Sequence, residues 1–166
     1  MQIDEWFDVV DEEDRPVRRE IRRVVHAQGL RHRAIHVLIF NRRGEVFLQK
    51  RSALKDMSPL TWDSSCSGHV DAGEDYDHAC IRELGEELGL ALSTVPVRWL
   101  RLAACPETGN EFVWVYRLSH EGPFRLSPAE IERGEWISPR ELVRRIAAQP
   151  NEFAPAFRFI WSRLPE

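Results

Sequence analysis

Three glutamates near the middle of the chain, Glu83, Glu86 and Glu87, have the spacing of ligands for a divalent cation. On an α-helix, positions i, i+3 and i+4 share one face, so these carboxylates would repel one another. Gathering ionised acids beside a packed surface is costly unless a cation neutralises them. Oxygen ligands around a partly hydrated ion suit Mg²⁺ or Mn²⁺. Taken alone, the triplet is better explained by a solvated acidic helix face than by a metal site.

The neighbouring residues supply other parts of such a site. An apolar stripe that would dock the helix on a sheet is formed by Cys80, Leu84 and Leu88. Arg82 lies beside the first glutamate and can hold a carboxylate through its fork of N–H donors. Upstream, Gly68 and Gly73 permit sharp turns that would let a backbone carbonyl face the metal. The segment therefore favours a metal site over a simple charged surface.

The complete spacing resembles one known signature. It consists of Gly68, five residues, Glu74, seven residues, Arg82-Glu83-Leu84, one residue, Glu86-Glu87, one residue, and Gly89-Leu90. At ordinary residue frequencies, seven fixed identities would match by chance on the order of once in a million chains. The chain is identified as a member of the Nudix hydrolase superfamily.

This resemblance implies an α/β Nudix fold, an α/β/α sandwich with a mixed β-sheet between helices. It also implies hydrolysis of a diphosphate linkage in compounds where a nucleoside diphosphate is joined to another group. Mg²⁺ or Mn²⁺ would be held by Glu83, Glu86 and Glu87 with the carbonyl of Gly68, and would activate a water. We expect Glu83 or Glu86 to take the proton, with Arg82 as a further catalytic residue.

A second resemblance concerns the subgroup. The opening FDVVDEEDRPV and the later segment LRHRAIHVLIFNRRGEVFLQKRSALKDMSPLTWDSSCSGH are similar to isopentenyl-diphosphate isomerase, a Nudix-fold enzyme that moves a double bond. Arg51 and Lys55 fall where the isomerase binds the diphosphate of its substrate. His32 and His69 fall where it has metal-binding histidines, and Glu111 matches its acidic catalytic residue.

Several departures disfavour isomerase activity. The isomerase uses a cysteine directly before the Gly-His pair to exchange a proton across the alkene, and here that residue is Ser67. Cys66 lies one position earlier and on a strand would point to the opposite face. The first of the isomerase's paired glutamates is replaced by Gly109, and its first histidine is matched only by His26, displaced by one residue. We therefore predict a Nudix hydrolase, with isomerase activity and a nucleotide-sensing binding module as alternatives.

Other polar residues are secondary candidates. His32 and His69 are more readily explained as hydrogen-bonded structural residues or phosphate contacts than as metal ligands. Acidic residues that could supply an extra ligand or base are Glu74, Glu111, Glu130, Glu132 and Glu135. The candidates for binding the substrate's phosphates are Arg51 and Lys55.

The hydrophobic pattern predicts the elements that position these residues. Strands are expected over 6–10, 34–40, 45–50, 97–102, 112–118 and 135–137, with a short extended piece after the turn at 11–14. Helices are expected over 18–28, 77–88, 139–148 and 156–163, with Ser138 as an N-cap. This order predicts one domain over 1–166, composed of an N-terminal ribbon and helix over 1–30 and the Nudix core over 31–166.

Composition limits the remaining options. The 166 residues are 43% hydrophobic with a formal net charge of −4, which argues against disorder and against a generally basic nucleic-acid binder. Residues 56–97 nevertheless hold nine acids against the single base Arg82, so the charge is unevenly distributed. Three cysteines without CxxC spacing and no long apolar run predict a cytoplasmic protein without a membrane segment. We expect a monomer or homodimer that acts on a small-molecule diphosphate.

Overall fold

The N-terminal segment is an antiparallel ribbon followed by a short helix. The computed structural model describes residues 4–166, so residues 1–3 of the predicted 1–30 segment lie outside the described residues. Strand β1 (Trp6–Val10), as predicted, pairs with β2 (Pro16–Ile21). Helix α1 (Arg22–Gln28) ends at Gly29, whose φ of 60° lies in the left-handed region that glycine adopts readily.

The first helix begins later than the sequence predicts. Residues 18–21 belong to β2, where Arg18 pairs with Val9 and Arg19 with Asp8. The prediction of a helix from Arg18 is wrong because the ladder with β1 binds the backbone groups of these residues. Arg18 and Arg19 are therefore strand residues and not part of a helical arginine face.

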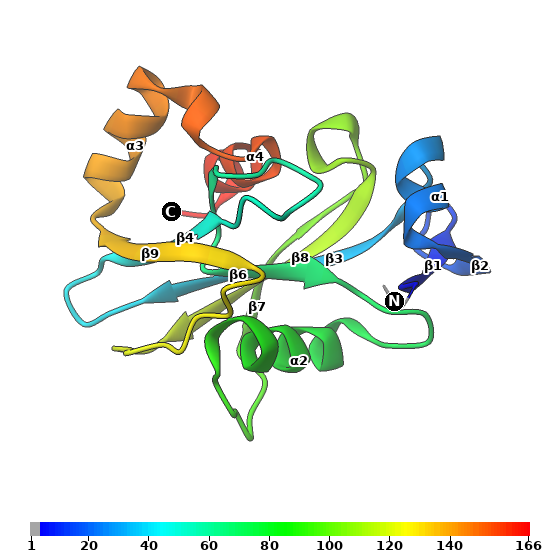
Figure 1. Ribbon diagram of the computed structural model, residues 1–166, viewed down its shortest axis with the longest axis horizontal. Coiled ribbons are helices and arrows are strands. Elements are labelled where there is room, and N and C mark those ends of the chain that lie inside the picture. The colour runs from blue at the N-terminus through cyan, green and yellow to red at the C-terminus, as the bar shows by residue number, and fades with distance from the viewer. Residues whose placement is uncertain (1–3) are drawn as a thin grey trace.

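A seven-stranded mixed sheet lies at the centre of the molecule (Figure 1). Its strands are β3 (His32–Phe40), β4 (Val46–Arg51), β5 (Trp62–Asp63), β6 (Cys66–His69), β7 (Val97–Leu102), β8 (Glu111–Ser119) and β9 (Ile131–Ile137). Strand β3 runs parallel to β8, and the other pairs are antiparallel. The predicted strands are confirmed, with β3, β8 and β9 starting earlier than expected, while β5 and β6 are additional.

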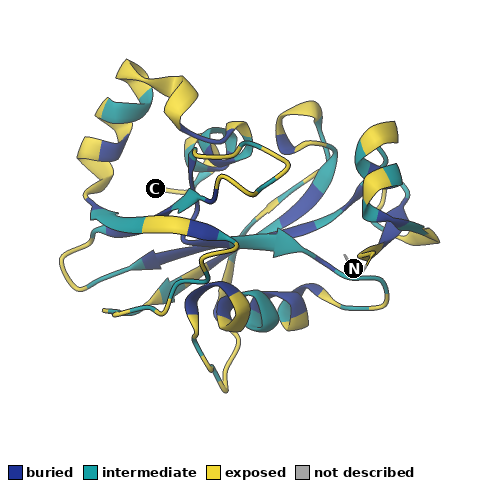
Figure 2. Ribbon diagram, viewed as in Figure 1, coloured by how far each residue is buried: buried dark blue, intermediate teal, exposed yellow. Residues whose placement is uncertain are grey.

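Helices cover both faces of the sheet, which confirms the predicted α/β/α sandwich (Figure 1). Helix α2 (Tyr76–Leu88) packs on one face, and α3 (Pro139–Ala148) and α4 (Pro155–Arg163) lie on the other. Two short 3₁₀ turns, η1 (Pro106–Thr108) and η2 (Pro150–Glu152), complete the elements. Buried residues follow the strands and the inner sides of the helices (Figure 2).

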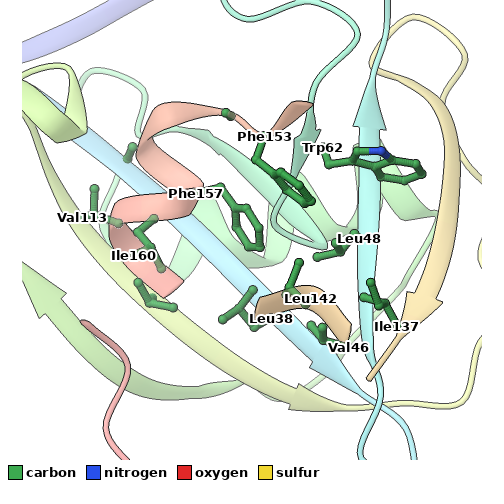
Figure 3. Packing of buried hydrophobic residues seen from close by; sticks show 13 residues of the cluster. Leu38, Val46, Leu48, Trp62, Val113, Ile137, Leu142, Phe153, Phe157 and Ile160 are labelled. Carbon is green, nitrogen blue, oxygen red and sulfur yellow. The ribbon is translucent and has the colours of Figure 1, made fainter. Parts of the chain in front are cut away.

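Successive side chains of β3 belong alternately to two separate hydrophobic cores. Ile35 and Val37 belong to the cluster under α2. Leu38 belongs to the opposite cluster, where it packs with Phe157 and Ile160 of α4 (Figure 3). Because successive side chains of a strand point to opposite faces, one strand anchors both helical layers.

The predicted helix signals are present. The Ser138 hydroxyl accepts a hydrogen bond from the backbone N–H of Glu141 (3.2 Å) and caps α3, as predicted. Gly89 ends α2 in the left-handed conformation. Over residues 4–166, no helix combines the length and apolar character needed to cross a membrane.

The β3–β4 hairpin opens soon after its turn. The two strands are paired at Phe40 and Val46, beyond which β3 pairs with β6, and β4 pairs with β5 and β9. The sheet therefore divides into two arms, with β4, β5 and β9 in one and β3 and β6 in the other.

Candidate active site

Helix α2 presents its three glutamates at different depths. Leu84 and Leu88 are fully buried against the sheet, and Glu87, on the adjoining side of the helix, is 3% exposed. The Glu83 side chain is 13% exposed and that of Glu86 is 59% exposed. Carboxylates thus extend from the interior to the surface within one helical turn.

These carboxylates line a cavity of about 180 Å³ at the end of β6. Gly68 of β6 faces Glu83, because a Cβ atom on Gly68 would lie 2.1 Å from Glu83 Cδ. No side-chain carbon tolerates such an approach, so the glycine lets the Glu83 carboxylate reach the backbone of β6. The cavity is also lined by Glu5, Arg22, Lys55, Ser67, His69, Asp71, Arg82 and Glu130.

Arg82 connects the acidic residues. Its guanidinium donates to both carboxylate oxygens of Glu74 (2.9 Å each), to Glu83 Oε1 (2.8 Å) and to Glu86 Oε2 (3.3 Å). It also donates to the carbonyl of His69 (2.9 Å), at the end of β6. The Arg82 guanidinium therefore orients three carboxylates and connects α2 to β6.

The acidic cavity is short of positive charge. Burial, together with nearby Glu86 and Glu130, raises the pKa of Glu83 to about 7 in spite of Arg82. Burial and the charge of Glu83 raise the pKa of Glu87 to about 8, although Gln49 Nε2 donates to its carboxylate (2.7 Å). A divalent cation would favour the ionised forms. Clustered carboxylate oxygens form a donor set that fits Mg²⁺ or Mn²⁺.

A second cluster of metal-ligating groups adjoins the first. One ligand atom from each of His26, His32, His69 and Glu111 lies within 4.8 Å of the others. Glu111 Oε1 is 2.9 Å from His69 Nε2 and 3.2 Å from His32 Nε2. The His32 Nε2 atom is buried without a well-formed hydrogen bond. Three imidazoles and one carboxylate suit a transition-metal ion.

The ribbon and α1 complete this histidine cluster. Phe7 of β1 stacks on the rings of His32 and His69, at centroid distances of 5.6 and 4.7 Å. Helix α1 carries His26 into the cluster, so its one-residue displacement in the sequence does not separate it from the other ligands.

Protonation states in the histidine cluster suit metal binding. Burial lowers the pKa of His26 to about 4 and also lowers the pKa of His69. Burial alone would raise the pKa of Glu111, but His32 and His69 hold it well below its usual range. Neutral imidazoles beside an ionised carboxylate are the forms that ligate metals.

The two basic candidates are already paired with acids. Arg51 Nη1 donates to Asp63 Oδ2 (3.0 Å), and its Nε donates to the carbonyl of Met57 (3.1 Å). Lys55 forms an ion pair with Glu130. Arg51 lines a second, larger cavity, whereas Lys55 lines both, so the two side chains reach the site from different sides.

The secondary acidic candidates separate in space. Glu130 lines the acidic cavity, and Glu74 contributes to the site through Arg82. Glu135 forms an ion pair with Arg145 and lines neither of the two cavities, and Glu132 is exposed on β9. The structure therefore brings Glu130 to the Nudix glutamates and leaves Glu132 and Glu135 outside.

The larger cavity, of about 460 Å³, adjoins the acidic one, and the two share Arg22, Lys55, Ser67, Gly68 and His69. Ser67 lines this cavity, whereas Cys66 is fully buried on the α2 side, as strand alternation predicts. Sequence reasoning did not find two further lining residues, His36 and Asp63. Each lies in a buried strand, where hydrophobic periodicity carries no sign of a polar role.

A mixed sheet between helices, with glutamates of one helix against a glycine of the neighbouring strand, is the arrangement expected of a Nudix fold, and Nudix hydrolase relatives support a hydrolase acting on acid anhydrides. The NUDIX domain model matches residues 30–157, and the chain belongs to this family, within its isomerase-like subgroup.

Two curated relatives and one solved structure illustrate the likeness. An uncharacterized Nudix hydrolase of Yersinia pestis is 36% identical over 156 residues, covering 91% of this chain and 80% of that protein. Isopentenyl-diphosphate Delta-isomerase of Nocardia farcinica is 37% identical over 131 residues, covering 76% and 75%. The crystal structure of a Deinococcus radiodurans protein superposes with a TM-score of 0.74 at 32% identity, covering 87% of this chain and 90% of that one.

Proposed function

We propose that this protein is a divalent-metal-dependent pyrophosphohydrolase. Its substrate is a nucleoside di- or triphosphate, or a nucleoside diphosphate joined to another group, and an activated water attacks the phosphoanhydride bond. The approach of Glu83 to Gly68 carries this proposal, because it brings that carboxylate against the backbone of β6 in the same cavity as Glu86 and Glu87. Lys55 and Arg51 supply positive charge for the substrate's phosphates.

Each site residue has a role in this proposal. Bound Mg²⁺ or Mn²⁺ would neutralise charge on phosphate oxygens and lower the pKa of a water. We assign Glu83, Glu86, Glu87 and the Gly68 carbonyl as its ligands. Glu83 or Glu86 receives the proton of the attacking water, and Arg82 holds both carboxylates in place.

Charge-removing substitutions test this assignment. Glu83→Gln and Glu86→Gln keep the side-chain size, and each is expected to lower kcat with Mg²⁺ by about 100-fold or more. Glu132→Gln, on the exposed side of β9, is the matched control and should retain full activity. Hydrolysis that continues unchanged in the Glu83 and Glu86 variants would place the active site elsewhere. Nucleotides, dinucleoside polyphosphates and sugar nucleotides form the substrate panel, with released phosphate or diphosphate as the readout.

Isomerase activity is the second candidate, and the cluster of His26, His32, His69 and Glu111 favours it. Against it, the side chain that faces the large cavity beside His69 is the hydroxyl of Ser67, not a thiol. Conversion of isopentenyl diphosphate to dimethylallyl diphosphate by the wild type would establish this activity. A nucleotide-sensing module, the third possibility, would show a nucleotide-dependent rise in Tm without turnover.

The histidine cluster and the cellular setting complete the proposal. We assign the cluster to a divalent transition-metal ion such as Mn²⁺, separate from the ion at the glutamates. Cys66, Cys80 and Cys105 are free thiols, which accords with a reducing cytoplasm. We expect a monomer or homodimer that acts on small molecules and not on nucleic acid.

A further inference from the structure

The larger cavity has polar groups on one side and apolar walls on the other. His36 of β3 and Asp63 of β5 line it and are 4% and 3% exposed. The apolar part of its lining comes from Val25, Ala34, Met57, Ala154 and Pro155. A cavity of this size and mixed lining is typical of a small-molecule site whose few polar groups set orientation and specificity.

Neighbouring residues hold these polar groups in fixed orientations. Asp63 Oδ1 accepts from the backbone N–H of Ser64 (2.7 Å), and its Oδ2 accepts from Arg51. His36 Nδ1 lies 2.8 Å from the Ser64 hydroxyl oxygen. Its Nε2 atom has no hydrogen-bond partner within residues 4–166. Burial lowers the pKa of His36, which favours the neutral imidazole.

His36 lines the cavity that adjoins the glutamate site. It is the direct cross-strand partner of Ser67, so the two side chains project from the same face of the sheet. Gly68 faces Glu83 on the other face of the sheet, and Ser67, Gly68 and His69 line both cavities. A substrate whose diphosphate lies at the glutamates would therefore extend its next chemical group past His36.

The chemistry of that group follows from the lining. A hydrocarbon chain against His36 would leave its Nε2 atom without a hydrogen-bond partner or water, which is unfavourable. A nucleoside offers N–H and O–H donors and ring acceptors to the polar groups, and flat ring faces to Met57 and Pro155. The shape and polarity of the cavity thus match a nucleoside better than an isoprenoid chain.

We propose that His36 and Asp63 are specificity-determining residues, which select a nucleoside over a hydrocarbon chain as the group attached to the diphosphate. This inference rests on the proposed hydrolase function. His36 contacts the nucleoside through Nε2, and Asp63 accepts a hydrogen bond from one of its N–H or O–H groups.

Steady-state kinetics on two substrate classes test this assignment. The kcat/KM for Mg²⁺-dependent hydrolysis is measured for ADP, CDP, GDP and UDP, and for isopentenyl diphosphate as the hydrocarbon probe. His36→Leu is expected to lower kcat/KM for the preferred nucleotide about 10- to 100-fold, mainly through KM, and to leave the value for isopentenyl diphosphate unchanged or higher. Asp63→Asn should shift the preference in the same direction.

Two further variants separate recognition from folding. His36→Gln keeps an amide near the position of Nε2 and is expected to restore most of the nucleotide preference. His78→Leu alters a histidine whose side chain is 81% exposed on α2, and it should behave as the wild type. Circular dichroism and Tm verify that each variant is folded.

The possible outcomes distinguish the specificity role of His36 from the hydrolase function on which it rests. Equal losses on both substrate classes in folded His36→Leu would overturn the specificity role, as would unchanged nucleotide kinetics. Wild-type protein that hydrolyses isopentenyl diphosphate in preference to every nucleotide would overturn this inference and leave the hydrolase function intact. Wild-type protein that hydrolyses neither isopentenyl diphosphate nor any compound of the nucleotide panel would overturn both.

Discussion

The Glu83 carboxylate occupies the space that a side chain on Gly68 would fill, since a Cβ atom there would lie 2.1 Å from Glu83 Cδ. Gly68→Ala is therefore expected to displace Glu83 and to lower kcat/KM about 100-fold, because a displacement of about 1 Å at a catalytic group has an effect of that size. Steady-state kinetics with Mg²⁺ measure the loss.

Gly85→Ala on α2 is the matched control for Gly68→Ala. A Cβ atom at Gly85 would lie 3.6 Å from the Leu90 carbonyl oxygen, its nearest contact beyond the backbone of its own helix, which is an ordinary contact distance. Alanine also favours a helix over glycine by about 1 kcal/mol, so this variant should keep its activity and unfold at the same or a higher temperature. Equal activities of the two alanine variants would contradict the role given to Gly68.

The raised pKa values of Glu83 and Glu87 couple metal binding to pH. Without metal, the pKa values of these carboxyls are about 7 and about 8 in the folded protein, against 4.5 for the unperturbed group. The folded state therefore binds more protons between these values, and its stability falls as pH rises from about 4.5 to about 8. Metal binds the ionised forms, so Mg²⁺ should raise Tm more at about pH 8 than at about pH 5.5.

Thermal unfolding at both pH values, with and without Mg²⁺, measures this coupling. Glu87→Gln removes one of the two titrating groups and should flatten the pH dependence, whereas Glu132→Gln should not alter it. A Tm increase of the same size at both pH values would contradict the assignment of these carboxylates as ligands.

Glu111 is the carboxylate of the histidine cluster, within 3.2 Å of both His32 and His69. Glu111→Gln is expected to weaken transition-metal binding about 10- to 100-fold, because an ionised ligand is replaced by a neutral amide. The visible absorption of bound Co²⁺ follows imidazole ligation directly. His120→Asn, outside the cluster, is the control, and an unchanged Co²⁺ affinity in Glu111→Gln would argue that the cluster holds no ion.

Asp14 anchors the N-terminal ribbon to the sheet and to α2. Its carboxylate, 8% exposed, accepts from Arg33 Nε (2.6 Å) and from the Tyr76 hydroxyl (2.7 Å). Asp14→Asn tolerates the positive φ of 64° but leaves Arg33 without its charged partner, which should lower the free energy of unfolding by about 1–3 kcal/mol. Urea denaturation measures the change. Glu12→Gln, whose side chain is 84% exposed in the same turn, should change it by less than about 0.5 kcal/mol.

Local signals predicted much of the fold. The expected bounds of α3 and β7 agree with the structure. Ser138 caps α3 and Gly89 ends α2, and both signals depend on contacts within one or two helical turns. The error at residues 18–21 has a non-local cause, because their pairing with β1 is decided by strands that the local helical pattern does not include. The two-residue strand β5 is likewise too short to have a period of its own.

In the candidate site, too, relations within one element were predictable from the sequence, and relations between elements were not. The spacing of Glu83, Glu86 and Glu87 places them on one helix face, and the structure agrees because the relation lies within a single element. No feature of the sequence separates Glu130 from Glu135 as an additional ligand or base. In the structure, Glu130 lines the acidic cavity, whereas Glu135 forms an ion pair with Arg145.

By itself, the sequence determined the family, the sandwich of helices around a mixed sheet, and the glutamates offered to a metal. Only the tertiary structure decided that His26 joins His32, His69 and Glu111, and that His36 and Asp63 face the cavity beside Ser67. The physical reason is that spacing specifies the geometry within one helix or strand. Burial, charge pairing and the facing of side chains from different elements depend on how those elements pack.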